Sequence, residues 1–447
     1  MTTNNAAWEK SSWRKFPAMQ QPNWPNPDEH RAVLDTIAKL PPLVFAGEIR
    51  RLKNMLAKAA QGDAFILQGG DCAEDFFNCT APGIRENLKV ILQMAVILTY
   101  AGGKPVIKVG RMAGQYAKPR SSDTEVVDGL EISSYRGDMV NSPEPLAAAR
   151  IPDPQRLLQG YYLSASTMNI LRAFTRGGYA ALHRVHAWNN EFVKRSPMGQ
   201  SYERLAKHID DALNFMRIVG INTDIPQLNQ ADFFTSHEAL LLGYEEALTR
   251  KDSTTGDWYD CSGHLLWIGE RTRQVDGAHA EFFRGVLNPI GVKIGPDHDL
   301  DDVKKLIDRL NPENEPGRLT LITRFGSKKI EQSLPPLVRA VKKEGAQVVW
   351  ICDPMHGNTY TAATGHKTRD FDEIMQEIRS FFEIHWGEGT APGGVHFELT
   401  GEDVTECTGG GRNIQDLNLN YQTNCDPRLN AEQSLELAFQ IAEMIRS

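Results

Sequence analysis

Short apolar segments alternate with longer amphipathic segments along most of the chain. The short segments predict buried strands at Ala64–Gln68, Pro105–Val109, Ala181–Val185, Asp232–Ser236, Leu265–Ile268, Gly291–Ile294, Leu319–Thr323, Gln347–Ile351 and Gly394–Leu399. The amphipathic segments predict helices at Arg85–Tyr100, Pro154–Arg176, Glu238–Arg250, Asp301–Leu310, Ile330–Glu344 and Asp370–Trp386. Repeated β/α units predict a parallel sheet, either doubly wound or closed into a barrel. A closed barrel of eight strands would leave one of these strand candidates over.

Two parts of the chain lie outside this alternation. Residues 1–28 are rich in Trp, Pro and Asn, and they predict an arm that packs against the rest of the chain or a neighbouring subunit. Asp28 is a candidate cap for a helix over Glu29–Leu40, and a second helix is expected over Gly47–Ala60. The segment Gly199–Gly220 has apolar residues near helical spacing with charges opposite, which predicts an inserted helical element.

The strand Gln347–Ile351 is followed by a polar sequence that cannot continue it. A proline there lacks a ladder donor, and the next Gly-Asn pair favours a turn. This directs Asp353, His356 and Asn358 away from the carboxyl end of the strand, where parallel α/β folds build their sites. The alternative is an ordinary strand end with a capping aspartate and a hydrogen-bonded histidine.

Composition and charge exclude several classes of protein. The chain of 447 residues has 49 Lys and Arg against 57 Asp and Glu, a formal net charge of −8, and it has no basic run. These features argue against binding to nucleic acid or to an acidic membrane surface. No stretch approaches the roughly 20 apolar residues that span a bilayer, and the N-terminus lacks a signal pattern. Six scattered cysteines without a CxxC pair favour reduced thiols in a cytoplasmic protein.

Cationic side chains follow the ends of several predicted strands. They are Arg111, Lys118, Arg120, Arg271, Lys293 and Arg324. A buried cation needs an anionic partner, and these residues outnumber the carboxylates nearby. As a group they predict a site for a ligand that carries phosphate and carboxylate. For any one of them taken alone, a structural ion pair is the better explanation.

A second set of strand-end residues combines a thiol, an imidazole and two carboxylates. It consists of Cys72, His356, Glu398 and Asp426. The mixture is too soft for calcium and unlike a closed structural zinc site, so it indicates a divalent transition metal. The alternative is that Cys72 is an inert buried thiol. If Cys72 and Asp426 share a metal, Cys425 lies near Cys72, and we predict that the metal-free protein forms a Cys72–Cys425 disulfide.

Five longer motifs resemble the class II 3-deoxy-D-arabino-heptulosonate 7-phosphate (DAHP) synthases. They are Leu67-Gln-Gly-Gly-Asp-Cys-Ala-Glu74, Gly114-Gln-Tyr-Ala-Lys-Pro-Arg-Ser121, Trp267-Ile-Gly-Glu-Arg-Thr-Arg273, Cys352-Asp-Pro-Met-His-Gly-Asn-Thr359 and Cys425-Asp-Pro-Arg-Leu-Asn430. The resemblance covers essentially residues 15–447, and no motif position departs from the family pattern. It implies an aldol-type condensation of phosphoenolpyruvate with D-erythrose 4-phosphate and water, which gives DAHP and phosphate at the start of the shikimate pathway.

The resemblance also implies roles for the strand-end residues. A divalent metal (manganese, cobalt or similar) would be held by Cys72, His356, Glu398 and Asp426. Phosphoenolpyruvate would lie among Arg111, Glu270, Lys293 and Arg324, with Arg271 near the phosphates. Erythrose 4-phosphate would be held by Lys118, Arg120 and Ser121. Glu270 or Glu238 would orient or deprotonate the attacking water, and Lys293 counts with them as a catalytic group.

The implied fold is α/β, a (β/α)₈ TIM barrel over residues 61–447 after an N-terminal extension over residues 1–60. Ala181–Val185 then becomes the surplus segment, and Asp232–Ser236 takes the third place in the barrel. Residues 199–220 match an additional helix pair that is tied to inhibition by aromatic amino acids. The arm matches an extension that makes subunit contacts. A homo-oligomer, either a dimer or a tetramer, is expected, and a chorismate mutase is a candidate partner.

Two other functions fit parts of this pattern. One is a related condensing barrel that uses another aldose phosphate, and the Lys118-Pro-Arg-Ser121 segment argues against it. The other is a non-catalytic protein that binds phosphoenolpyruvate and activates a partner. The complete set of four metal ligands argues against that reading, because a protein without catalysis has no need of all four.

Overall fold

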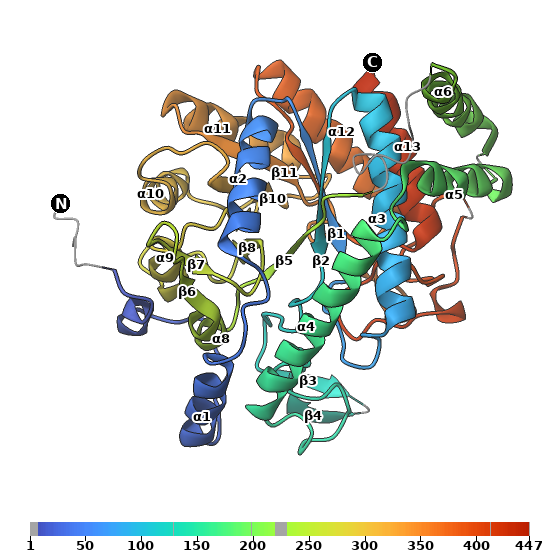
Figure 1. Ribbon diagram of the computed structural model, residues 1–447. Coiled ribbons are helices and arrows are strands. Elements are labelled where there is room, and N and C mark those ends of the chain that lie inside the picture. Colours follow the sequence, from blue (N-terminus) through green and yellow to red (C-terminus); the bar gives the residue numbers. More distant parts are fainter. Residues whose placement is uncertain (1–7, 128, 198, 220–229, 412, 447) are drawn as a thin grey trace.

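Eight parallel strands close into a barrel in the computed structural model of the chain, which describes residues 8–446 except 128, 198, 220–229 and 412 (Figure 1). Around the barrel, the strands follow one another in the order β1, β14, β11, β10, β9, β8, β5 and β2. Their bounds are Phe65–Gly70 (β1), Val106–Arg111 (β2), Phe234–Glu238 (β5), Leu265–Ile268 (β8), Ile290–Ile294 (β9), Leu319–Thr323 (β10), Val348–Cys352 (β11) and Gly394–Glu398 (β14). The TIM barrel is confirmed, with Asp232–Ser236 contributing its third strand in chain order as expected.

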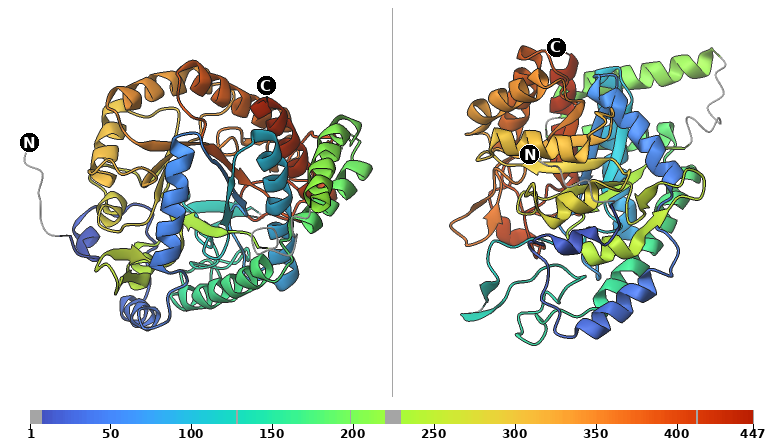
Figure 2. Two further views of the ribbon diagram at one scale, coloured as in Figure 1. Left: turned by 45° about the horizontal axis from the view of Figure 1, so that its top comes forward. Right: turned by 90° about the vertical axis from the view of Figure 1, so that its left-hand side faces the viewer.

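Most helices form an outer ring around these strands, as the left view of Figure 2 shows. The helices that follow barrel strands are α3 (Ala81–Gly102), α4 (Gln155–Arg176), α8 (Leu242–Leu248), α9 (Ala278–Phe283), α10 (Leu300–Leu310), α11 (Ile330–Lys343), α12 (Phe371–Gly387) and α13 (Ala431–Arg446). In α10, Val303, Leu306 and Leu310 form the buried face. The side chain of Asp299 caps this helix by accepting from the backbone N–H groups of its first turn. None of the described helices is long and apolar enough to cross a membrane.

Short hairpins lengthen the loops between these elements. They are β3 (Thr124–Val127) with β4 (Leu130–Ser133), β6 (Thr249–Lys251) with β7 (Trp258–Asp260), and β12 (Tyr360–Thr361) with β13 (Lys367–Thr368). Two 3₁₀ helices lie at Ser12–Lys15 and Leu417–Leu419. The β3–β4 hairpin follows β2 and the β12–β13 hairpin follows β11, so both extend the loops at the carboxyl end of the barrel.

Two segments between β2 and β8 fold differently from their predictions. Ala181–Val185 is not a strand, because it leads into α5 (Leu182–Arg195), whose buried residues Val185 and Asn189 are one helical turn apart. A short apolar run fits a strand or a buried helix equally well when periodicity is the only guide. The helix expected over Glu238–Arg250 is shorter, because Glu238 ends β5 and the chain enters β6 directly after α8.

The N-terminal extension folds onto the barrel of its own chain. Helix α1 (Pro27–Ile37) is capped by Asn26 and not by Asp28, since the Asn26 side chain accepts from the backbone N–H of Glu29. In the arm, Trp13 is buried and donates its indole N–H to Glu246, just before the end of α8. The described part of the arm therefore packs against its own chain, with Trp13 buried and Trp8, Phe16 and Trp24 half-buried. Residues 1–7 of the predicted arm lie outside the described residues.

Helix α2 (Ala46–Ala60) covers the amino end of the barrel. Its Leu56 is fully buried among residues that point into the barrel, such as Ile66 of β1. The helix also approaches the loop before β10 closely, because a Cβ at Gly317 would collide with the α2 backbone. Glycine also tolerates the φ of +77° at this position. Since α2 covers this end of the barrel, the carboxyl ends of the strands form the accessible side.

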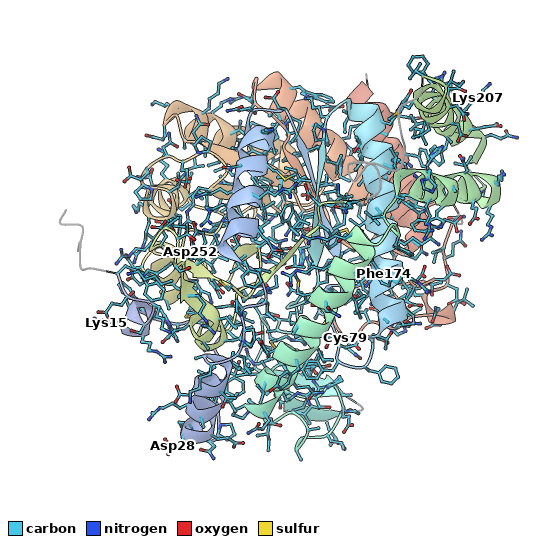
Figure 3. All side chains as sticks on the ribbon, viewed as in Figure 1. Lys15, Asp28, Cys79, Phe174, Lys207 and Asp252 are labelled. Carbon is cyan, nitrogen blue, oxygen red and sulfur yellow. The ribbon has the colours of Figure 1, made fainter. Side chains whose placement is uncertain are left out.

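Helices α5 and α6 (Gly199–Ile218) form a pair outside the ring of barrel helices. Tyr202 of α6 and Phe192 of α5 both stack on Phe439 of α13, with ring centroids 4.4 and 6.0 Å apart respectively. Figure 3 labels the exposed Lys207 on α6, at the edge of the molecule. The predicted insertion therefore corresponds to α6, its partner α5 lies before the predicted range, and Gly220 falls outside the described residues.

Candidate active site

A cavity of about 240 Å³ lies at the carboxyl end of the barrel. Every residue to which the sequence assigned a site role lines it: Cys72, Arg111, Lys118, Arg120, Ser121, Glu238, Glu270, Arg271, Lys293, Arg324, His356, Glu398 and Asp426. These residues are distant in sequence, but the carboxyl ends of parallel strands meet at one end of a barrel. Their shared location is thereby established, while their individual roles stay predictions.

Three of the four predicted metal ligands lie together. The Sγ of Cys72 and one carboxylate oxygen each from Glu398 and Asp426 lie within 4.8 Å of one another. The barrel register explains part of this proximity, because Glu398 ends β14 directly opposite Gly70 of β1, two residues before Cys72. A thiol and two carboxylates at this separation are a chemically suitable donor set for a divalent transition metal.

His356, the fourth predicted ligand, faces the same cluster from the loop after β11. Its Nε2 lies 3.1 Å from Oε1 of Glu398, and its Nδ1 lies 2.8 Å from Oδ2 of Asp353. A carboxylate on one ring nitrogen orients a histidine and directs its other nitrogen toward a metal. Asp353 is therefore a supporting group behind His356, a role that the sequence could not distinguish from a strand-end cap.

The Lys118 ammonium lies among these predicted ligands. It donates to Cys72 Sγ at 2.7 Å and to the Asp426 carboxylate. A cation is therefore accommodated between Cys72 and Asp426, which supports the fit of a metal ion to these residues. The sequence assigned Lys118 to erythrose 4-phosphate together with Arg120 and Ser121. Arg120 pairs with Glu125.

The charges around the cluster control its protonation. Burial alone would raise the pKa of Glu398, but His356, Arg369 and Arg111 outweigh it and hold that pKa well below its ordinary value. Burial and a hydrogen bond with Cys425 instead raise the pKa of the Cys72 thiol. A bound cation reverses this preference, since a coordinated thiol loses its proton. The carboxylates are thus ionised in advance, and the Cys72 thiol would lose its proton to coordinate a metal.

Next to the cluster, the buried cations Arg111 and Lys293 form one side of the cavity, which we call the positive wall. The charged ends of Arg111 and Lys293 lie 5.3 and 5.8 Å from the centre of the Trp267 ring. Lys293 is buried and forms an ion pair with Asp353. Burial, and then the charges of Arg111 and Arg324, lower the pKa of Lys293 to about 8, although Asp353 acts in the opposite direction. This desolvated group of cations is suited to an anionic ligand.

Glu238 and Glu270 also face the cavity, but their carboxylates are held differently. Oε1 of Glu238 is buried and has no hydrogen-bond partner within the described parts of the chain. Burial raises its pKa even though Lys293 and other nearby cations oppose the shift. Glu270 accepts from Arg273 at 2.7 Å and from the backbone N–H of Gly295 at 2.6 Å. Of these two carboxylates, Glu238 is therefore the one that is less constrained by hydrogen bonds.

Five further side chains line the cavity that sequence reasoning did not assign: Gln115, Pro119, Trp267, Thr359 and Lys367. Lys367 pairs with Asp426 at 3.0 Å from β13, a hairpin strand outside the barrel, so no strand-end pattern indicated it. Gln115 accepts from the Glu238 backbone N–H. Gln115, Trp267 and Thr359 lie within the motifs quoted above, so closer attention to uncharged motif residues would have found them.

Comparison with known proteins agrees with the resemblance that the sequence motifs show. A family model described as the class-II DAHP synthetase family matches residues 8–442. A phospho-2-dehydro-3-deoxyheptonate aldolase of Streptomyces coelicolor is 58% identical over 438 residues, which covers 98% of this chain and 97% of that protein. The phospho-2-dehydro-3-deoxyheptonate aldolase AroG of Mycolicibacterium smegmatis is 53% identical over 437 residues, which covers 96% of this chain and 93% of that protein.

Proposed function

The chain belongs to the class-II DAHP synthetase family, and from this premise we propose how its cavity performs the family's reaction. The protein condenses phosphoenolpyruvate with D-erythrose 4-phosphate and water to give DAHP and phosphate, the first step of the shikimate pathway. The observation that carries the proposal is one cavity that holds a metal-capable cluster, a positive wall and a buried carboxylate without a partner.

A divalent metal such as manganese or cobalt would be held by Cys72, His356, Glu398 and Asp426. When bound, the metal supplies Lewis acidity toward the aldehyde oxygen of erythrose 4-phosphate. The protein prepares the site in advance, because Asp353 orients His356 and the nearby cations keep Glu398 ionised.

The cations bring the two anionic substrates together. Arg111, Lys293 and Arg324 bind phosphoenolpyruvate, with Glu270 and Arg271 beside its phosphate, and Lys118, Arg120 and Ser121 hold the phosphate of the aldose. Without these charges the two substrates would repel each other, so holding them in contact removes much of the entropic and electrostatic barrier. The C=C π electrons of phosphoenolpyruvate then form a bond from its methylene carbon to the aldehyde carbon. The aldehyde C=O π bond breaks, its oxygen takes up a proton to become a hydroxyl, and positive charge develops on the adjacent carbon of phosphoenolpyruvate.

Glu238 is the proposed general base for the next step. It removes a proton from a water molecule as that water adds to the electron-poor carbon, and the hemiketal phosphate then loses inorganic phosphate by C–O cleavage. Its raised pKa and its free Oε1 support this assignment. Glu270 is already engaged by Arg273 and Gly295, which supports a role in positioning for that residue.

Regulation is proposed to involve the α5–α6 pair. This pair covers α13 and leaves Phe215 and Ile218 at the end of α6 exposed, which supports a contact or effector role. Inhibition by aromatic amino acids, a homo-oligomer, a chorismate mutase partner and a cytoplasmic location stay predictions.

A phosphate-release assay tests the proposed function. With manganese, both phosphoenolpyruvate and erythrose 4-phosphate should be required for phosphate release, and chelation should abolish it. Release with a different aldose phosphate, but not with erythrose 4-phosphate, would favour a related condensing enzyme. Binding of phosphoenolpyruvate without any release would favour the non-catalytic alternative.

A further inference from the structure

We propose that Arg369 is a positioning residue that holds the metal ligands in place, an inference that rests on the proposed metal site. Arg369 lies between β13 and α12, outside every motif that the sequence analysis used. Its side chain is 0% exposed, and it is not among the residues that line the active-site cavity. A fully buried guanidinium must be satisfied by acceptors in the protein, and those acceptors reveal what it does.

The Arg369 guanidinium spreads over three separate segments of the chain. Nη2 donates to Oε2 of Glu398 at 2.7 Å, and Nε donates to Oγ1 of Thr359 at 2.9 Å. Nη1 donates to the backbone oxygen of Pro427. One rigid, planar group therefore connects the end of β14, the loop after β11 and the loop before α13.

Each of these segments carries a predicted metal ligand. Glu398 is itself a ligand, Pro427 directly follows Asp426, and Thr359 is three residues after His356. Arg369 thus fixes the relative positions of three of the four ligands without contacting the metal. The fourth, Cys72, lies on a segment that Arg111 holds through the backbone oxygens of residues 71 and 72.

Arg369 also selects the oxygen that Glu398 presents. The guanidinium occupies Oε2, so Oε1 is the oxygen on the His356 side, where it lies 3.1 Å from His356 Nε2 and also accepts from Arg111 Nη2 at 3.0 Å. The carboxylate is thereby prepared to bind a metal through one oxygen. An outer group that fixes a ligand in this way tunes metal affinity and geometry.

The backbone of Arg369 is anchored as well. Its carbonyl accepts from the backbone N–H of Thr408 at 2.9 Å. The next residue, Asp370, caps α12 with its side chain and pairs with the same strand-like segment at Thr408. Arg369 therefore lies directly before the start of α12, and its backbone is fixed by that helix. A rigid backbone favours a fixed orientation of the guanidinium and of the ligands that it contacts.

Substitution of Arg369 by lysine tests this role, because lysine keeps the charge but cannot reach three acceptors in different directions. Manganese affinity is measured without substrates, from the electron paramagnetic resonance signal of free Mn²⁺. We expect Arg369→Lys to raise the Kd by about 10- to 100-fold. In the cobalt-loaded protein, the ligand-field bands should shift, while the thiolate-to-cobalt band from Cys72 should persist.

Arg318 provides a matched control. It is also buried and also donates to several backbone oxygens, but it lies before β10, at the amino end of the barrel. Arg318→Lys should lower thermal stability and leave the manganese Kd within about twofold of wild type. This comparison separates the loss of a buried arginine from the loss of ligand positioning.

Thr359→Val supplies a milder test if Arg369→Lys does not fold. It removes the acceptor of Arg369 Nε and should raise the manganese Kd by at least about threefold. This effect is smaller than that of Arg369→Lys, because only one of the three guanidinium contacts is lost. If the folded Arg369→Lys protein binds manganese with wild-type affinity and has an unchanged cobalt spectrum, the inference about Arg369 is overturned, while the proposed metal site is not affected. Failure of the wild-type protein to bind manganese or cobalt would instead overturn the proposed metal site.

Discussion

At the scale of single residues, burial and hydrogen bonding give similar side chains different chemistry. Glu238 and Glu270 both line the cavity, but the Glu238 backbone is fixed by Gln115 while its carboxylate Oε1 has no partner in the described structure. A glycine at 269 leaves the room that this carboxylate occupies, since a Cβ there would collide with it. Both residues are thus glutamates, but Glu238 is better placed to accept a proton than Glu270, whose carboxylate already accepts hydrogen bonds.

Glu238→Gln should therefore lower kcat by about 10²- to 10⁴-fold, the usual size of a general-base effect. Burial raises the Glu238 pKa, and protonation removes the base, so the wild-type rate should fall as the pH drops through that raised pKa. The variant should lose this acidic limb. The measurement is kcat for phosphate release as a function of pH.

Glu270→Gln is the matched control, because it alters the other carboxylate in the same cavity. It should weaken phosphoenolpyruvate binding and retain the acidic limb, since its hydrogen bonds to Arg273 and Gly295 indicate positioning. The opposite result, in which Glu270→Gln loses the limb and Glu238→Gln keeps it, would reassign the base to Glu270.

Cys72 and Cys425 are both free thiols and are close enough to share a hydrogen bond, which lowers the pKa of Cys425. We predict that metal-stripped protein exposed to air forms a disulfide between them. The two thiols lose two electrons and two protons to dioxygen, which becomes hydrogen peroxide. Reactivation by manganese should then require a reductant.

Peptide mapping of the oxidised protein checks this prediction, with Cys425→Ser as the control that cannot form the bond. The prediction fails if both thiols stay free and manganese alone restores activity.

At the scale of secondary-structure elements, two parts outside the barrel strands have separate tasks. Helix α2 covers the amino end of the barrel, and the α5–α6 pair covers α13. The first task concerns stability and the second is proposed to concern regulation, so substitutions in the two parts should have different effects.

Leu56→Ala in α2 should destabilise the protein by about 2–5 kcal/mol, because it removes a fully buried side chain and leaves a cavity. Lys58→Ala, on the exposed side of the same helix, should have little effect. Denaturant unfolding of both variants gives the comparison. Equal loss of stability in the two variants would show that α2 does not seal the barrel.

Phe215→Ser at the exposed end of α6 should weaken inhibition by aromatic amino acids by roughly fivefold or more, the lower range of an allosteric coupling. A point substitution is preferable to deletion of the insertion, because Tyr202 of α6 is stacked on Phe439 and deletion would uncover α13. Leu146→Ser, which changes an exposed apolar residue elsewhere, is the control. Unchanged inhibition in Phe215→Ser would place the effector site away from this end of α6.

At the scale of the whole molecule, the sequence pattern was sufficient for a parallel sheet of β/α units, because each buried strand is a short apolar run with polar residues at its carboxyl end. The closure of that sheet into a barrel was expected only from the resemblance to the class II DAHP synthases. The pattern failed at Ala181–Val185, since a short apolar run has no periodicity that separates a helix turn from a strand. It also missed α2 as the cover of the barrel, because an amphipathic helix does not reveal what its apolar face contacts.

The positions of the site residues were predictable for a related reason. Strand-end groups converge in any closed barrel, so Cys72, Lys293 and Glu398 were found without knowledge of contacts. Lys367 and Arg369 were missed, because a hairpin and a helix start bring them to the cluster from outside the barrel. The difference between Glu238 and Glu270 depends on tertiary hydrogen bonds, which one sequence does not contain.

The central claim is that the four mixed ligands hold a divalent metal beside the phosphoenolpyruvate site. Crystals grown with manganese and phosphoenolpyruvate, and measured at the manganese absorption edge, test it most directly. We predict one dominant anomalous peak bounded by Cys72 Sγ, His356 Nε2 and carboxylate oxygens of Glu398 and Asp426, with the Lys118 ammonium displaced from its present contacts. A dominant peak bound by other residues, or none at this cluster in catalytically active crystals, would contradict the account.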